Sequence, residues 1–533
     1  MALTVVATRE GVLDAADQAA FDALKSRLAT GDRKVMLFLH GGLVKEADGR
    51  EQAVEVSNGL ALDASWEQVC VVWRTGLLEE LADNWRKLID SDALYKAVLA
   101  WLVHHVASKV KVAGDGATLL EAKPLTRGEI RARFDRATGH PVADLEALAT
   151  GPDRVISVQD ISPEQIRAEL QASLDKDAEL KAALQDLGAA VMIRVGASPR
   201  AGDAAAGAIS FSHLNRKIQE RLKASGSRAA HERTITEFVA IWDIVAAAAE
   251  VAWRVFNRYR THRDHGFYAT VVEELAREIF GDYIGGDIWD LMKQNAANHF
   301  KPRGFGTALV EALSQSANSN RIVVIGHSAG SIWASEFLKA LSNSPRPFPI
   351  DLVFIAGAVR VNAFAEALAE GEQHVRRFRA YAMDDPTERK DTLIQKPPGL
   401  EWVYPSSLLY LVSGLFEATP DQNHHLTPYV DAPLVGLARF FETGGVPSWL
   451  TEDDEARALR TVLDFYGKHH PAAYYGPGDQ GPGMNSKAHD HGDYETDGPT
   501  LTSINYAFLS DPPHAGLTTS RETTAARPTE PAE

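Results

Sequence analysis

Apolar runs and helical periodicities alternate along the first 75 residues. The runs Leu3–Ala7, Lys34–Leu39 and Gln68–Trp73 are largely apolar, a pattern typical of buried strands. Between them, Asp14–Leu28 and Glu51–Leu62 carry apolar residues at helical spacing. Because strands and helices alternate, this part of the chain is predicted to form a doubly wound, mostly parallel α/β sheet.

The same alternation returns after residue 320. Ile322–Ile325, Ile350–Ala356 and Val375–Met383 have the composition of three further buried strands. Apolar residues recur at helical spacing over Trp333–Leu341, directly after the first of these strands, and again over Ser407–Phe416. The α/β pattern therefore occupies two separated parts of the sequence.

The sequence between Arg74 and Asn320 has helical patterns but no comparable series of strands. The predicted helices there are Leu77–Ile89, Ala93–Val106, Pro163–Leu174, Phe211–Leu222, Ile235–Arg258 and Val271–Phe280. Thr126-Arg-Gly-Glu129 and Ser162-Pro-Glu-Gln165 have the form of capping boxes, which open helices.

A connection of this length is too long for a loop. Residues 76–299 are therefore predicted to be an inserted, mainly helical domain, and residues 1–75 and 300–515 the α/β core. The tail, 516–533, has almost no large apolar residue and is predicted to be disordered.

Composition and charge narrow the classes of function. A net charge of −17 repels nucleic acid, which is therefore not an expected partner. The first residues contain no basic leader and no long apolar stretch, so no signal peptide is expected. The most apolar helical pattern, Phe238–Phe256, contains Asp243, Glu250 and Arg254, so no integral membrane segment is expected. The single cysteine, Cys70, fits a reducing compartment and is predicted to be a buried strand residue. A cytoplasmic location is expected.

The segment Gly326-His-Ser-Ala-Gly330 lies between a predicted strand and a predicted helix. It matches Gly-x-Ser-x-Gly, in which the glycines allow a turn tight enough to present the serine above the sheet edge. The flanking strand and helix are the context that this motif requires. Ser328 is therefore the predicted nucleophile.

With this motif, the sequence resembles the α/β-hydrolase superfamily over about residues 1–75 and 300–510. The resemblance implies a mostly parallel sheet with helices on both faces and a serine, acid and histidine in that chain order. It also implies an oxyanion hole after an early strand, where His40-Gly-Gly-Leu43 follows a predicted strand. We expect Gly42 and Ala329 to supply its N–H groups, with Gly41 and Leu43 as alternatives for the first.

The triad acid of this superfamily follows the strand two places after the nucleophile strand. That position corresponds to Asp384 or Asp385, and we expect Asp385 because Pro386 fixes the turn directly after it. Glu417 is a third candidate, although the residues before it suit a helix better than a strand.

The catalytic histidine must follow the acid in the chain. His491 is the expected base, because a His-Gly step followed by an aromatic and acidic residues resembles the histidine loop of bacterial hydrolases of this type. His489 is the nearest alternative, and His424 and His425 are the others.

Four neighbouring residues are potential metal ligands, namely His489, Asp490, His491 and Asp493. The sequence lacks His-Glu-x-x-His and a cysteine cluster, so no metal is expected. No glycine-rich segment has the spacing of a nucleotide-binding loop, and no cofactor is expected.

These observations predict a serine hydrolase that cleaves a carboxylic ester of esterase or lipase type through an acyl-enzyme on Ser328. An amidase or peptidase would use the same triad on a small-molecule or peptide amide substrate. A binding or scaffold protein that has kept the fold is the alternative from another class. The helical insertion is expected to act as a lid or cap, because its junctions lie beside strands of the catalytic layer; an interaction module is the alternative.

Overall fold

The computed structural model describes two compact units. Unit 1 comprises Met1–Glu79, Asp290–Glu388 and Pro433–Glu533, and unit 2 comprises Glu80–Trp289 and Arg389–Ala432. The described residues are 2–30, 33–41, 46–73, 93–111, 117–136, 142–150, 157–158, 162–176, 233–280, 286–315, 321–391, 404, 406–417, 431–450, 453–511 and 513.

The division into units differs from the predicted domain bounds chiefly at residues 389–432, besides shifts of ten residues or fewer at the two ends of the predicted insertion. Arg389–Ala432, which was predicted to belong to the core, groups with the mainly helical unit instead. The role of the helical unit as a lid stays a prediction. The predicted tail, 516–533, lies outside the described residues.

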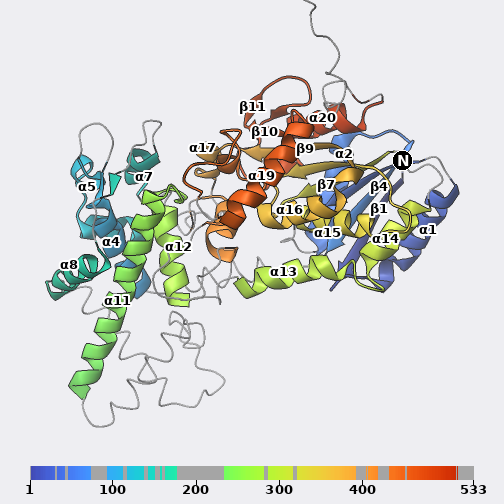
Figure 1. Cartoon of the computed structure of the whole chain (residues 1–533). Helices are drawn as coiled ribbons and strands as arrows, with labels where there is room; N and C mark the ends of the chain where they lie inside the picture. Colours follow the sequence, from blue (N-terminus) through green and yellow to red (C-terminus); the bar gives the residue numbers. More distant parts are fainter. Residues whose placement is uncertain are drawn as a thin grey trace, which may run out of the picture. The chain divides into compact units, whose positions relative to one another are not determined.

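Unit 1 contains a mostly parallel eight-stranded sheet, which confirms the predicted α/β class (Figure 1). The strand order is β10-β9-β8-β7-β3-β4-β1-β2, and only β2 pairs antiparallel. The strands are β1 (Ala2–Arg9), β2 (Val12–Leu13), β3 (Lys34–Leu39), β4 (Trp66–Trp73), β7 (Ile322–His327), β8 (Ile350–Ile355), β9 (Val375–Met383) and β10 (Ala473–Gly476). All six predicted strands are present, and β2 and β10 were not predicted.

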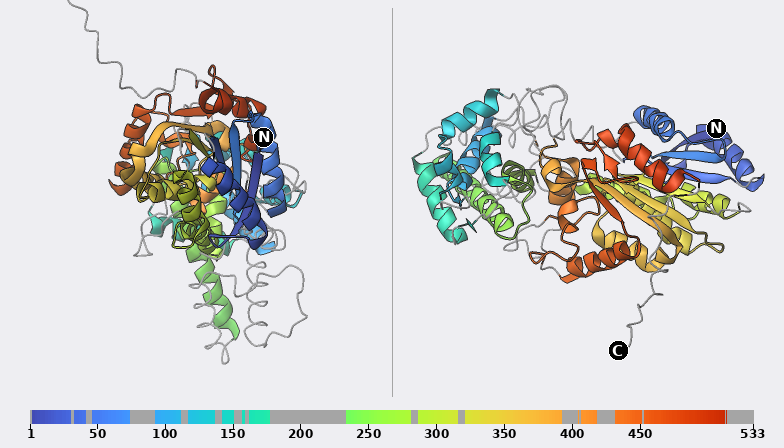
Figure 2. Two further views of the ribbon diagram at one scale, coloured as in Figure 1. Left: turned by 90° about the vertical axis from the view of Figure 1, so that its right-hand side faces the viewer. Right: turned by 90° about the horizontal axis from the view of Figure 1, so that it is seen from above.

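Helices cover both faces of this sheet, which explains why its central strands are apolar without alternation. Every residue of β4, β7 and β8 is buried. One face carries α1 (Gln18–Thr30), α14 (Phe305–Ser314), α15 (Gly330–Ser342), α16 (Val361–Gly371) and α19 (Asp453–Lys468), and the other carries α2 (Glu46–Leu60) and α20 (Gly498–Ile504) (Figure 2).

Contacts on the two sides of β4 show these faces directly. Glu67 points to the first face, where the Arg27 Nε lies 3.0 Å from its Oε2. Val72, five residues later, points to the opposite face and lies close to Gly49 of α2. A Cβ added to Gly49 would be only 2.9 Å from the Val72 Cγ1. Period-two alternation along the strand therefore separates the layers.

The register of β3 and β7 brings two turns to the same edge of the sheet. Leu39, at the carboxyl end of β3, pairs with Gly326 near the end of β7. Because both strands are parallel, the segments that follow them leave the sheet side by side. The predicted oxyanion segment and the predicted nucleophile are neighbours for this reason.

The described residues of unit 2 are mainly helical. Its described helices are α4 (Ala93–Ala107), α5 (Leu119–Ala122), α6 (Arg127–Arg136), α7 (Ala143–Thr150), α8 (Pro163–Asp175), α11 (Arg233–Arg260), α12 (Phe267–Phe280) and α18 (Leu408–Leu411), and α13 (Gly286–Asn298) crosses the boundary between the units. Both predicted capping boxes form, with the Thr126 and Ser162 N–H groups donating to the side chains of Glu129 (2.7 Å) and Gln165 (2.9 Å). Within the described residues, no helix has the length and apolar character needed to cross a membrane.

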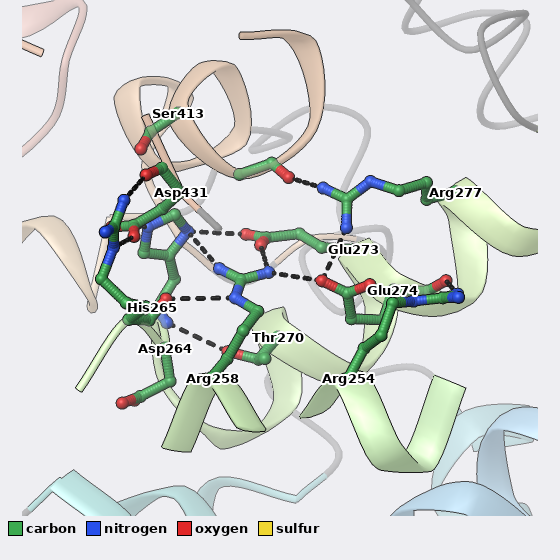
Figure 3. A network of polar contacts seen from close by, with 12 residues as sticks. Arg254, Arg258, Asp264, His265, Thr270, Glu273, Glu274, Arg277, Ser413 and Asp431 are labelled. Atoms are coloured by element: carbon green, nitrogen blue, oxygen red, sulfur yellow. Dashed lines mark hydrogen bonds and ion pairs between the residues drawn. The ribbon is translucent and has the colours of Figure 1, made fainter. Parts of the chain in front are cut away.

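A buried network of charged side chains joins α11, α12 and the segment around α18 (Figure 3). The Nη1 of Arg258 lies 2.5 Å from Glu273 Oε2 and 3.1 Å from Glu274 Oε1. Arg263 pairs with Asp431, and Arg277 donates to the Gly414 carbonyl. The network therefore attaches Gly414 and Asp431 to the helices of unit 2, which explains why the described residues around them group with that unit.

Candidate active site

The turn between β7 and α15 holds Ser328 in a strained backbone conformation. Its φ of 51° lies in the left-handed region, which costs a residue other than glycine roughly 1–3 kcal/mol. The Ser328 N–H donates to the Ile355 carbonyl (2.8 Å), and the Ser328 carbonyl accepts from the Ala358 N–H (3.0 Å) and the Ser331 hydroxyl (2.6 Å). The predicted nucleophile therefore sits on a turn that β8 and its following loop hold in place.

The two glycines of the motif are required by close approach. A Cβ on Gly326 would lie 2.8 Å from the Gly330 carbonyl carbon, and one on Gly330 would lie 2.2 Å from the Leu39 carbonyl oxygen of β3. Real Cβ atoms do not come so near to backbone atoms. The helix α15 can thus begin directly against the sheet only because these positions lack side chains.

The segment after β3 lies against the serine. A Cβ on Gly41 would be 3.3 Å from the Ser328 Cβ and 3.5 Å from the His327 Nδ1. Gly42, the expected oxyanion donor, and its alternative Leu43 lie outside the described residues. Ala329, the other expected donor, is fully buried and immediately precedes α15, whose first N–H groups have no partners within the helix.

His40 fixes the backbone that leads into this segment. Its Nε2 accepts the Trp73 N–H (3.1 Å), so its proton resides on Nδ1, which donates to the Gly41 carbonyl (2.5 Å). The Trp73 indole N–H in turn donates to the His40 carbonyl (3.2 Å). Burial lowers the pKa of His40, which keeps the ring neutral and the arrangement intact. This role was not predicted.

His491 comes close to the elbow through His327. The two rings stack with centroids 5.3 Å apart, and the His327 Nε2 lies 3.3 Å from the His491 carbonyl oxygen. Both ring nitrogens of His491 are shielded from solvent. Burial, and then the neighbouring His327, lower the pKa of His491 to about 3, so its ring is neutral at physiological pH.

The alternative histidines differ in their surroundings. His489 is exposed on the same loop, and its backbone N–H donates to Asp493. His424 and His425 lie outside the described residues. Of the two histidines in the 485–497 loop, His491 is thus the one that contacts a residue of the elbow.

Two aspartates hold the loop that carries His491. The Asp493 carboxylate accepts the N–H groups of His489 and Asp490 (both 3.1 Å). Asp497 caps α20, and its Oδ2 also accepts the Lys487 N–H (3.0 Å). Neither role was predicted, because such contacts within a loop leave no periodic pattern in the sequence. The carboxylate of Asp493, a potential metal ligand in the sequence, instead accepts hydrogen bonds from the loop backbone.

The two expected acids follow β9 directly. Asp384 accepts the Thr387 N–H through Oδ1 (2.9 Å), which makes it the cap of α17 (Asp385–Glu388). Asp385 is half-buried, and burial followed by the charges of Asp385 and Asp384 raises the pKa of Glu442. Both aspartates therefore lie in a carboxylate-rich region at the end of β9.

The third candidate acid, Glu417, belongs to unit 2 and has its contact there. Its Oε1 accepts the indole N–H of Trp289 at 2.6 Å, and both residues belong to unit 2. The helical pattern before it is confirmed by α18 and a following π-helix, Val412–Phe416.

Glu495 is the carboxylate that contacts a histidine beside the serine. Its Oε1 lies 2.8 Å from the His327 Nδ1, and both side chains are buried. This pair was not predicted, since the two residues are separated by 168 positions. The acidic residues after His491 were the only available signal.

Together these residues place a strained serine, glycine backbone and a neutral buried imidazole at one edge of the sheet. Such parts suit nucleophilic attack on a carbonyl. Among the described residues, no group of three or more His, Cys, Asp or Glu side chains could hold a metal ion. The structure shows Cys70 buried in β4, where burial raises its pKa to about 12, as suits a packing residue.

Comparisons of the chain with family models, with curated proteins and with solved structures found no match.

Proposed function

We propose that this protein is a serine hydrolase that cleaves a carboxylic ester through an acyl-enzyme on Ser328. The observation that carries the proposal is the strained φ of 51° at Ser328, on a turn between a buried strand and a helix. Strain of this kind persists where the surrounding structure enforces it and is concentrated at active sites. The glycine contacts around the serine support the same conclusion.

The order of the strands supports an arrangement of the α/β-hydrolase type. The parallel strands β3, β7, β8, β9 and β10 are consecutive in the sheet. Ser328 follows β7, Asp384 and Asp385 follow β9, and His491 follows β10. A nucleophile, an acid and a base thus leave the sheet from the carboxyl ends of its strands in the chain order of that superfamily.

In the proposed reaction, neutral His491 takes the proton of the Ser328 hydroxyl as the oxygen attacks the ester carbonyl. Asp385 orients the imidazole and stabilises the imidazolium that forms. The N–H groups of Ala329 and Gly42 stabilise the tetrahedral oxyanion, each contributing about 3–4 kcal/mol. The imidazolium then protonates the leaving alcohol, and water activated by the same histidine hydrolyses the acyl-enzyme.

A fluorophosphonate probe tests this proposal, because it reacts with an activated serine. We expect labelling of the wild-type protein at Ser328 and its loss in Ser328→Ala, together with loss of p-nitrophenyl ester hydrolysis. Ser335→Ala is the matched control, since Ser335 lies on α15 and donates to the Ser331 carbonyl. Labelling that persists in Ser328→Ala would exclude Ser328 as the nucleophile.

Paired variants of the same protein test the base and the acid. We expect His491→Ala to lower kcat by about 10⁴-fold or more, whereas exposed His489→Ala has little effect. Asp385→Asn should reduce kcat more than Asp384→Asn. A reversed order within either pair would transfer the role to the neighbouring residue. Hydrolysis of amides but not esters by the active wild-type protein would instead indicate an amidase.

A further inference from the structure

The ring of His327 lies between two hydrogen-bond acceptors. Its Nδ1 is 2.8 Å from the Glu495 carboxylate, and its Nε2 is 3.3 Å from the carbonyl oxygen of His491. A neutral imidazole carries one proton and could donate to only one of them. Its other nitrogen would then direct a lone pair at an oxygen, which is repulsive.

Protons on both ring nitrogens satisfy both contacts. The imidazolium then donates to Glu495 through Nδ1 and to the His491 carbonyl through Nε2. The carboxylate beside it supplies the counter-charge that a buried cation requires. Side-chain exposure is only 5% for His327 and 6% for Glu495, so solvent screens this attraction weakly.

Other ionisable groups around His327 are compatible with a cation there. His491 stacks on it, and the charge of His327 contributes to the lowered pKa of His491. His40, after β3, also has a lowered pKa, chiefly through burial. Tyr494 lies with its ring centroid 6.5 Å from that of His327, and burial raises its pKa well above the usual value. His40, His491 and Tyr494 are thus neutral, and Glu495 is the counter-ion.

We propose that the ion pair of His327 and Glu495 is a positioning latch that holds the His491 loop against the nucleophile turn. This inference rests on the proposed serine hydrolase function. His327 belongs to β7 and directly precedes Ser328, so its bond to the His491 carbonyl ties the backbone of the base to the backbone of the nucleophile. Neither His327 nor Glu495 exchanges a proton with the substrate; both act through His491.

Two substitutions of His327 separate the two bonds of the latch. The amide of glutamine can reach the position of Nε2 and donate to the His491 carbonyl, whereas the shorter asparagine reaches only toward Glu495. We expect His327→Asn to lower kcat for p-nitrophenyl acetate by about 100-fold, His327→Gln to retain most of it, and KM to change little in both. Equal losses, or no loss, in the two variants would overturn the latch.

Substitution of Glu495 tests the other contact of His327. In Glu495→Gln the imidazolium loses its counter-charge, so the His491 loop is held less firmly, and kcat should fall while KM changes little. Glu336→Gln, which removes a surface partner of Lys339, is the control and should leave both constants unchanged. An unchanged kcat in Glu495→Gln would contradict the proposal.

The protonation state of His327 can be measured without substrate. Nitrogen-15 NMR of the ring, assigned by comparison with His327→Gln, should show both nitrogens bonded to hydrogen at neutral pH. A single protonated nitrogen would overturn the latch even in an active enzyme. Failure of the proposed function is recognised separately, as absence of fluorophosphonate labelling at Ser328 in the wild-type protein.

Discussion

Each of the two units contains a buried cluster of charged groups around a histidine, and the clusters differ in what surrounds them. In unit 1, His327 pairs with Glu495 beside the strained Ser328. In unit 2, His265 lies 2.9 Å from Glu273 through Nδ1 and 3.2 Å from Asp431 through Nε2. Both histidines therefore have acceptors on two sides.

The cluster of unit 2 is built as a network of opposed charges. Its cations and anions alternate in space (Figure 3). The cations are Arg254, Arg258, Arg263 and Arg277, and the anions are Glu273, Glu274, Glu278 and Asp431. Although burial opposes it, the charges of the arginines hold the pKa of Glu274 at about 2.

The difference shows what distinguishes a structural cluster from a catalytic one. Buried ion pairs alone fix one arrangement of segments and contribute little net stability. The cluster of unit 1 adds a nucleophile in a costly backbone conformation and glycines that leave room beside it. Strain next to a nucleophile, more than buried charge, marks the candidate active site.

The largest expected effect on stability is in unit 2. Arg258→Met leaves Glu273 and Glu274 buried without their guanidinium, which should cost about 3–5 kcal/mol of unfolding free energy. Arg457→Met, which removes an exposed pair with Asp454, should change stability by less than about 0.5 kcal/mol. Urea denaturation followed by circular dichroism measures both. Equal effects of the two variants would show that the network does not hold the unit together.

Acidification should destabilise unit 1 at a higher pH than unit 2. Burial lowers the pKa of His299 and of His469 in unit 1 to about 4, and that of His491 to about 3. Between the usual value near 6.5 and these values, the unfolded chain binds more protons than the folded one, so stability falls as pH falls through this range. The carboxylate Glu274 of unit 2, with its lowered pKa, loses its contribution only below about pH 4.5.

Hydrogen exchange at pH 7.5 and pH 5.5 tests this order. Amides of β3, β7 and β8 should lose protection at pH 5.5 more than amides of α11 and α12. His299→Gln, which removes one of the titrating groups, should reduce the difference in unit 1. His105 in unit 2 has a pKa near 4 as well, so α4 is excluded from the comparison. An equal loss of amide protection in both units would contradict the prediction that acid destabilises unit 1 first.

The smallest expected effect is the release of strain at the nucleophile. Ser328→Gly should abolish ester hydrolysis and yet raise the free energy of unfolding by about 1 kcal/mol, because glycine adopts a positive φ without cost. Ser335→Gly, within α15, should instead lower it by about 0.5–1 kcal/mol. A differential scanning calorimetry measurement distinguishes the two signs. A lower Tm for Ser328→Gly would mean that the serine side chain stabilises the turn.

Much of unit 1 was predictable because its signals are local. The continuous apolar runs of β4, β7 and β8 reflect burial on both faces, and the glycines at 326 and 330 reflect contacts that any strand, tight turn and helix must make. The edge strands β2 and β10 were missed because strands of two and four residues give too few positions for a pattern.

The sequence by itself determined the α/β class, the strand and helix around Ser328 and the capping boxes, because each depends on residues close together in the chain. Only the tertiary structure decided that residues 389–432 group with the helical unit, since the contacts of Asp431 with Arg263 and of Gly414 with Arg277 span more than 130 positions. The same holds for His327 and Glu495, 168 positions apart. Such pairs leave no periodic trace, because the attraction between opposite charges depends on their distance in space and not on their spacing in the chain.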